Sequence, residues 1–162
     1  MQLQTWFDAT TIAAISAIAN AATAAGLFFA MWQLRVTKTI AQLHFEDSLA
    51  KEYRDLAARI PTKAFYGAAL SETEHKQSRD EFFRYIDLSN EQVSLRARNR
   101  ISKAVWESWC AGIKYNLNLP AFRRAWSEIK DRTTSFNELR ALETNEFNVD
   151  PRCQKGSPLA LR

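Results

Sequence analysis

The feature that most constrains this chain is an uninterrupted apolar stretch near its N-terminus, IAAISAIANAATAAGLFFAMW, residues 12–32. No charged residue occurs between Asp8 and Arg35, a run of 26 positions. As an α-helix, this run would be roughly 39 Å long, whereas the hydrocarbon core of a bilayer is about 30 Å thick. The stretch is therefore long enough to cross a membrane once.

Three interpretations of this stretch compete: a retained membrane span, a cleaved signal peptide, and the core helix of a soluble domain. A signal peptide carries Lys or Arg before its apolar stretch, but the first basic residue here is Arg35, which follows it. Aromatic residues flank the stretch, as is typical of membrane–water interfaces; they are Trp6, Phe7, Phe28, Phe29 and Trp32. We therefore predict a retained transmembrane segment within residues 1–35.

Positive charge follows the span and does not precede it. Arg35 and Lys38 lie directly after the apolar stretch, and basic residues are enriched on the cytoplasmic side of membrane helices. The sequence therefore predicts a single-pass protein with its N-terminus outside and the rest of the chain in the cytoplasm.

The span is rich in alanine and contains several polar residues. Small residues that repeat every four positions allow helices to approach closely, and an amide within a membrane gains by bonding to a partner helix. The alanine row comprises Ala13, Ala17, Ala21 and Ala25. We predict a homo-oligomer assembled through the span. Either Asn20 forms hydrogen bonds across a tight bundle, or Ser16, Asn20 and Thr23 line a water-filled pore.

The remaining sequence is typical of an all-α protein. Glycine and proline are scarce, at four each, and apolar residues recur at three- and four-residue spacing. We expect the span to continue as a helix until Pro61, within a helical cytoplasmic domain over residues 36–147. Residues 148–162 contain turn formers and show no periodicity, so we expect a loose C-terminal tail.

Several local signals mark helix ends in this domain. Ser71 with Glu74, and Ser135 with Glu138, have the spacing of capping boxes at helix N-termini. The first pair should begin one helix that carries the apolar residues from Phe82 to Val93. Pro120 suits the first turn of another helix. We expect the tryptophans of the domain to fill its core; they are Trp106, Trp109 and Trp126.

Nothing in the sequence forms a recognisable catalytic, metal or cofactor site. His44 and His75 have no partners at metal-ligand spacing, so we expect both to be solvated or partly packed surface residues. The two cysteines, Cys110 and Cys153, lie in different settings and suggest neither a disulfide framework nor a metal site. Phosphate-binding loops, nucleophile elbows and dinucleotide fingerprints are also missing. We therefore expect no cofactor and no enzymatic activity.

The densest basic run comprises Arg96, Arg98, Arg100 and Lys103, in a chain of net charge +4. Such a patch can contact phosphates of nucleic acid or anionic lipid headgroups, or be neutralised by acidic neighbours on an ordinary helical surface. The run lacks the complete pattern of any nucleic-acid-binding module. We therefore expect a neutralised surface, or contact with anionic lipid or a protein, rather than with nucleic acid.

The segment from Tyr85 to Lys130 resembles the core of a widespread family of small bacterial proteins. In that family a single N-terminal membrane helix precedes a helical cytoplasmic domain of unknown function. The matching groups are Asn90-Glu91-Gln92, Arg100-Ile101-Ser102, Trp106, Trp109, Gly112-Ile113-Lys114, Pro120-Ala121-Phe122 and Ala125-Trp126. The resemblance implies a bacterial inner-membrane protein and gives no activity.

A more distant likeness is to the small membrane protein that accompanies an RNA-targeting CRISPR nuclease and assembles into a ring-shaped pore. Its domain is related to helical nucleotide-binding folds whose ribonuclease members carry Arg, often followed by Asn, with His four to six residues later. Arg98-Asn99 matches the start of that pattern, but no histidine follows in that window. This likeness therefore implies the architecture and argues against ribonuclease chemistry.

Two functions follow as hypotheses. The first is a non-enzymatic oligomer in the membrane that forms a pore or perturbs the bilayer, and the resemblance implies a setting in bacterial phage defence. The second is a membrane-tethered module that recruits a protein or RNA through the basic run from Arg96 to Lys103.

Overall fold

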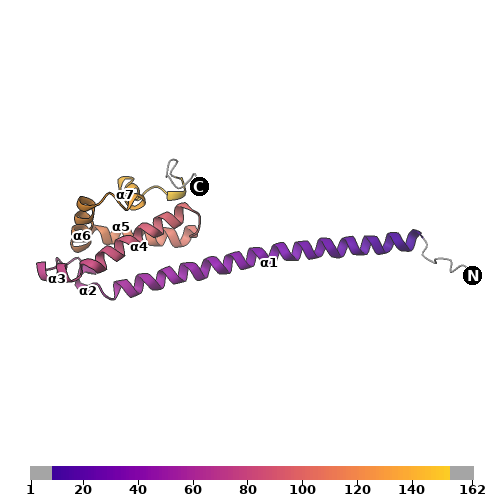
Figure 1. Ribbon diagram of the computed structural model, residues 1–162, viewed down its shortest axis with the longest axis horizontal. Coiled ribbons are helices and arrows are strands. Elements are labelled where there is room, and N and C mark those ends of the chain that lie inside the picture. The colour runs from indigo at the N-terminus through magenta and orange to yellow at the C-terminus, as the bar shows by residue number, and fades with distance from the viewer. Residues whose placement is uncertain (1–8, 154–162) are drawn as a thin grey trace, which may run out of the picture. The chain divides into compact units, whose positions relative to one another are not determined.

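The computed structural model describes residues 9–153, and within that range it contains helices and no strand. The elements (Figure 1) are α1 Ala9–Ala57, α2 Thr62–Phe65, α3 Glu72–Gln77, α4 Arg79–Ala97, α5 Lys103–Asn118, α6 Pro120–Arg132, α7 Asn137–Thr144 and the 3-10 helix η1 Pro151–Cys153. The predicted all-α class is confirmed. Trp6 and Phe7, which we expected at a membrane interface, lie outside the described residues.

The chain forms two compact units that divide between Leu43 and His44, inside α1. In its described part, the first unit is a single helix whose residues are exposed from Thr11 to Ala41. As expected, α1 continues past Arg35 and ends at Ala57, shortly before Pro61. The division between the units lies inside a continuous helix, because no helix breaker separates the apolar stretch from the residues that follow it.

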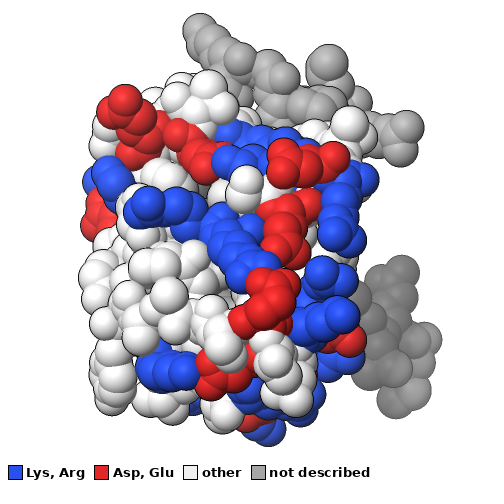
Figure 2. Space-filling model, turned by 90° about the vertical axis from the view of Figure 1, so that its left-hand side faces the viewer, with Lys and Arg blue, Asp and Glu red and all other residues white. Residues whose placement is uncertain are grey.

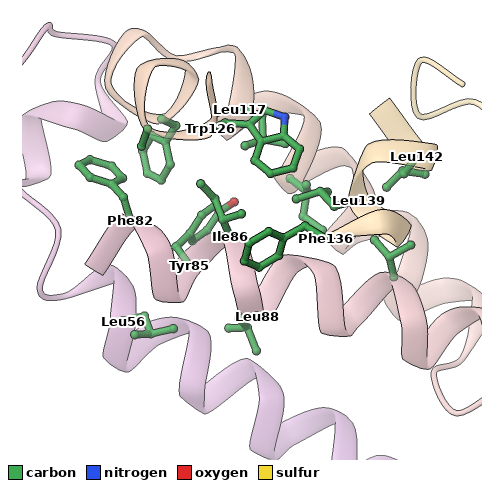
Figure 3. Packing of buried hydrophobic residues seen from close by; sticks show 14 of the residues in the cluster. Leu56, Phe82, Tyr85, Ile86, Leu88, Leu117, Trp126, Phe136, Leu139 and Leu142 are labelled. Atoms are coloured by element: carbon green, nitrogen blue, oxygen red, sulfur yellow. The ribbon is translucent and has the colours of Figure 1, made fainter. Parts of the chain in front are cut away.

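In the second unit, α4 is the central helix, and it packs against α3, α6, α7 and η1. Its inner face carries Phe82, Tyr85 and Ile86, which are at most 2% exposed. Figure 3 shows these side chains directed toward the helices that cover α4. On another side of α4, Leu88 and the α1 residue Leu56 are also buried. Burial of these side chains is the main source of stability for the unit.

Aromatic rings fill the space between α4 and α6. The ring of Phe122 lies 5.0 Å from those of Phe82 and Tyr85, in the edge-to-face geometry that favours aromatic pairs. Trp126 and Trp106 are buried, at 2% and 4% exposed, whereas Trp109 is partly buried at the edge of the core. The predicted core role of the tryptophans is confirmed for Trp106 and Trp126.

The first predicted capping box is present, but the helix that it starts is shorter than expected. Ser71 Oγ accepts a hydrogen bond from the Glu74 N–H, and the Glu74 carboxylate accepts one from the Ser71 N–H. The helix ends at Gln77, and Ser78 is both the residue that follows α3 and the residue that precedes α4. The single helix predicted through Val93 is therefore two helices. Pro120 is the first residue of α6, as predicted.

The second predicted capping box is wrong. Phe136, not Ser135, precedes the first residue of α7, and its side chain makes no capping hydrogen bond. Phe136 has φ of 66° and ψ of 41°, the left-handed conformation, which is rare for a bulky residue. This conformation accompanies burial of its ring beside Trp126, with 6.3 Å between the centroids. Burial of an aromatic ring has outweighed the local preference for a serine cap.

The predicted loose tail begins too early. Residues 151–153 form η1, Pro151 is buried, and η1 packs against α4. Asp150 pairs with Arg96 on α4. Residues 148–153 are therefore part of the folded unit, and residues 154–162 lie outside the described residues.

Candidate functional site

The apolar part of α1 is the most unusual surface of the protein. By length and composition, α1 is the one helix among the described residues that is able to cross a membrane. Its large apolar side chains are exposed, among them Ile18 at 70% and Phe28 at 72%. Monomeric soluble proteins rarely leave contiguous apolar patches of this size in water. This part of α1 is therefore a candidate membrane span.

The polar residues of this helix differ in their hydrogen bonds. Helix geometry places Ser16, Asn20 and Thr23 along one side of α1. The Thr23 hydroxyl donates to the carbonyl of Ala19 at 2.8 Å, which satisfies its proton inside the helix. The Asn20 amide has no partner among residues 9–153. Asn20 is therefore the residue of this set with the greatest need for a partner outside its own helix.

The predicted basic patch is wrong for Arg96. This residue is 1% exposed, and its guanidinium donates to both carboxylate oxygens of Asp150 and to the carbonyl of Ile101. A buried guanidinium requires such partners because transfer of an unpaired charge out of water is costly. Arg96 therefore links α4 to the loop before α5 and to the segment between α7 and η1, and is not available for an external ligand.

The rest of the predicted patch is small. Asn99 takes the left-handed conformation, with φ of 58°, just after α4 ends, and Arg98 and Arg100 on either side of it are exposed. Neither makes an ion pair with a described residue. Lys103 lies 3.6 Å from Glu107, one turn further along α5. Two free arginines remain from the predicted group of four.

The ion pair with Arg96 explains why Asp150 is ionised although it is partly buried. Its burial opposes ionisation, but hydrogen bonds from Arg96 and from the Arg152 N–H, together with the charge of Arg96, lower the pKa of the Asp150 carboxyl below its ordinary value. Asp150 therefore stays ionised as the partner of Arg96. The sequence had assigned it to a loose tail, and no local pattern marks it, since 54 residues separate the two partners.

His75 is buried, which the sequence did not predict. It is 2% exposed and stacks on Phe82 with 5.9 Å between the ring centroids. Its Nε2 lies 3.1 Å from Oε1 of Glu128 on α6, and its Nδ1 is buried without a partner among the described residues. The His75–Glu128 pair joins α3 to α6. His44 is exposed, as expected.

Charged residues of both signs alternate around the His75–Glu128 pair. Arg124 contacts Glu128 at 3.2 Å and Glu72 at 2.7 Å, and Lys63 contacts Glu74 at 2.7 Å. Figure 2 shows the face on which blue and red side chains are interleaved. Hydrogen bonds from Lys63 and from Ser71 lower the pKa of Glu74 to about 2. A surface of mixed sign does not present the single-sign field that attracts nucleic acid.

Within residues 9–153, no group of three or more His, Cys, Asp or Glu side chains is arranged to hold a metal ion. Cys110 and Cys153 are both free thiols. Burial raises the pKa of the Cys110 thiol, which disfavours its reactive thiolate form. Cys153 is exposed.

Comparison of the chain with models of protein families, with curated proteins and with solved structures gives no significant match.

Proposed function

We propose that the protein is a non-enzymatic membrane protein that spans the bilayer once through α1 and assembles with copies of itself. The observation that carries this proposal is the exposed apolar surface of α1 from residue 11 to 41. A helix satisfies its own backbone hydrogen bonds, which makes it the stable form for a single span in lipid. The folded unit from His44 onward then lies on one side of the membrane.

The direction of insertion follows from charge. Arg35 and Lys38 lie at the C-terminal end of the apolar stretch, which supports an N-terminus outside and a helical domain in the cytoplasm. The resemblance of residues 85–130 to bacterial membrane proteins supports the bacterial inner membrane as the location.

Asn20 supports assembly through the span. Its amide has no partner in its own chain over residues 9–153, and an unpaired amide in hydrocarbon is costly. In an oligomer, Asn20 side chains of neighbouring copies supply that partner. In a ring with a central path, Ser16, Asn20 and Thr23 face water, and the protein is a pore-forming or membrane-perturbing effector of bacterial defence.

The alternative function is a tethered module that binds a protein or RNA through basic residues. It rests on Arg98 and Arg100, which are exposed without an ion pair in the described part of the chain. Arg96 is buried and Lys103 lies beside Glu107. The two exposed arginines that remain support this function less well than the four basic residues expected from the sequence would.

The experiment that tests assembly is the mass of the full-length protein in mild detergent, measured by native mass spectrometry. We expect an oligomer, and a closed ring of about six or more copies supports the pore, because one or two helices do not enclose a water-filled path. Conductance across planar bilayers then tests the pore directly. A monomer at all detergent-to-protein ratios contradicts assembly, and a dimer contradicts the pore.

A further inference from the structure

A pocket of about 350 Å³ opens on the helical domain between α1, α4 and α5. All the residues that line it belong to the unit that begins at His44. Tyr53 of α1 and Trp109 and Ile113 of α5 contribute apolar walls, and both aromatic residues are only partly buried. Mostly apolar pockets with a few polar groups are typical of small-molecule sites.

Gln92 contributes an amide to this pocket that has no partner in the described part of the chain. Gln92 is 5% exposed and lines the pocket. Its side chain makes no hydrogen bond to any residue within 9–153. The amide atoms are not sealed from water, so they face the pocket. A side chain that is mostly buried, with its amide open only toward a pocket, can offer that amide to a ligand.

A second amide lies in the same pocket and is held in place. Asn116 is 5% exposed, and its Nδ2 donates to the Tyr85 hydroxyl oxygen at 3.0 Å. Its Oδ1 has no partner in the described part of the chain. Burial raises the pKa of Tyr85 to about 12, so the phenol stays neutral. The buried polar groups of the pocket are therefore two amides and a phenol. The exposed Arg54 also lines it and carries the one charge among the lining residues.

We propose that this pocket binds a small, planar ring compound that carries no positive charge and whose edge has a hydrogen-bond donor beside an acceptor. Gln92 and Asn116 offer donors and acceptors to that edge, as side-chain amides do to the edges of bases. The rings of Tyr53 and Trp109 offer stacking surfaces. A cationic ring would meet the guanidinium of Arg54, which also lines the pocket, and no negative charge among the lining residues. The chemistry is shared by nucleobases and by aromatic carboxamides such as nicotinamide.

The test is calorimetric titration of the full-length protein in detergent with adenine, uracil and nicotinamide. These polar probes partition little into micelles, and indole serves as a planar control that has a donor but no acceptor. We expect at least one of the three probes to bind once per chain, about tenfold more tightly than indole. Binding of the bases alone assigns the site to a nucleobase, and binding of nicotinamide alone assigns it to a carboxamide. No binding of any of the three at about 10 mM overturns the proposal.

Two variants test the location of the site. Gln92→Leu removes the unpaired amide at similar size, so the protein should stay folded and lose about tenfold in affinity. Gln77→Leu, on the exposed surface of α3, is the matched control and should leave affinity unchanged. Gly112 lines the pocket, and a Cβ there meets no atom within 4 Å. Gly112→Met should therefore fill the pocket and abolish binding while it favours the helix. Unchanged affinity in both variants overturns the proposal.

Discussion

At the residue scale, the pair formed by Arg96 and Asp150 shows how one buried charge organises the surrounding chain. Arg96 is 1% exposed and binds Asp150 and the carbonyl of Ile101. Removal of one member of a buried pair leaves the other without compensation, which costs more than the pair itself contributes. These contacts therefore hold the folded position of residues 148–153 against α4.

Asp150→Asn should lower the free energy of unfolding at pH 7 by about 3 kcal/mol, because it leaves the charge of Arg96 uncompensated. Urea unfolding of the full chain in detergent, followed by tryptophan fluorescence, measures the change. Asp131→Asn, at an exposed site on α6, is the control and should change stability by less than about 0.5 kcal/mol. Equal stability of both variants would contradict the structural role of the pair.

The contribution of Asp150 should also depend on pH. Its pKa is lower in the folded than in the unfolded chain, so its stabilising effect is complete above about pH 5, where the unfolded carboxyl is fully ionised. It is lost as the pH falls through the lower folded pKa. The difference in unfolding free energy between the wild type and Asp150→Asn should therefore shrink from pH 7 to about pH 3. A difference that stays constant over this range would contradict the ion pair.

At the element scale, α7 begins at a residue that local preference would not select. Phe136 is in the left-handed conformation and 8% exposed. That conformation costs about 1–2 kcal/mol for a residue with a side chain. Loss of a buried phenylalanine costs about 3–5 kcal/mol, so packing against Trp126 and Phe83 outweighs the strain.

Phe136→Gly tests this balance, because it relieves the strain and removes the ring. We expect a net loss of about 2 kcal/mol in the free energy of unfolding, measured by urea denaturation. Asn99→Gly, at an exposed residue with a similar φ of 58°, should have little effect, because asparagine already tolerates this conformation. A gain in stability for Phe136→Gly would show that strain, not packing, dominates at this position.

The other element that sets the behaviour of the protein is α1, whose apolar surface is exposed and whose Asn20 has no partner among residues 9–153. Asn20→Leu should weaken self-association by about 1–2 kcal/mol per helix contact, read as a shift toward smaller species by native mass spectrometry. Thr23→Val is the comparison, because the Thr23 hydroxyl is already bonded to Ala19 and its loss should matter less. An unchanged oligomer in Asn20→Leu would exclude this amide as the contact.

At the scale of the whole molecule, the proposed topology has a direct chemical test. The sequence has two cysteines. Cys153 is exposed, and Cys110 is half-buried with a raised pKa. Thiol reagents attack the accessible thiolate, so Cys153 should be the main site of labelling in the folded protein.

In intact bacterial spheroplasts, a membrane-impermeant maleimide should therefore fail to label the protein, and permeabilisation should allow labelling at Cys153. Cys153→Ala should remove most of the signal, whereas Cys110→Ala should preserve it. Labelling of Cys153 before permeabilisation would place the helical domain outside and reverse the proposed orientation.

The sequence alone determined the features that depend on neighbours close along the chain. The all-α class follows from periodicity, the candidate span from the length of the uncharged run, and the starts of α3 and α6 from Ser71 with Glu74 and from Pro120. Each of these signals acts within one or two helical turns. They can be identified in the sequence without knowledge of the tertiary structure.

The tertiary structure alone decided which polar residues are buried. Arg96 and His75 look like surface residues in the sequence, but their partners Asp150 and Glu128 lie 54 and 53 residues away. Gln92 likewise gives no local sign that it lines a pocket between three helices. Helical periodicity defines which residues share a face of a helix, whereas burial of that face depends on how distant helices pack against it.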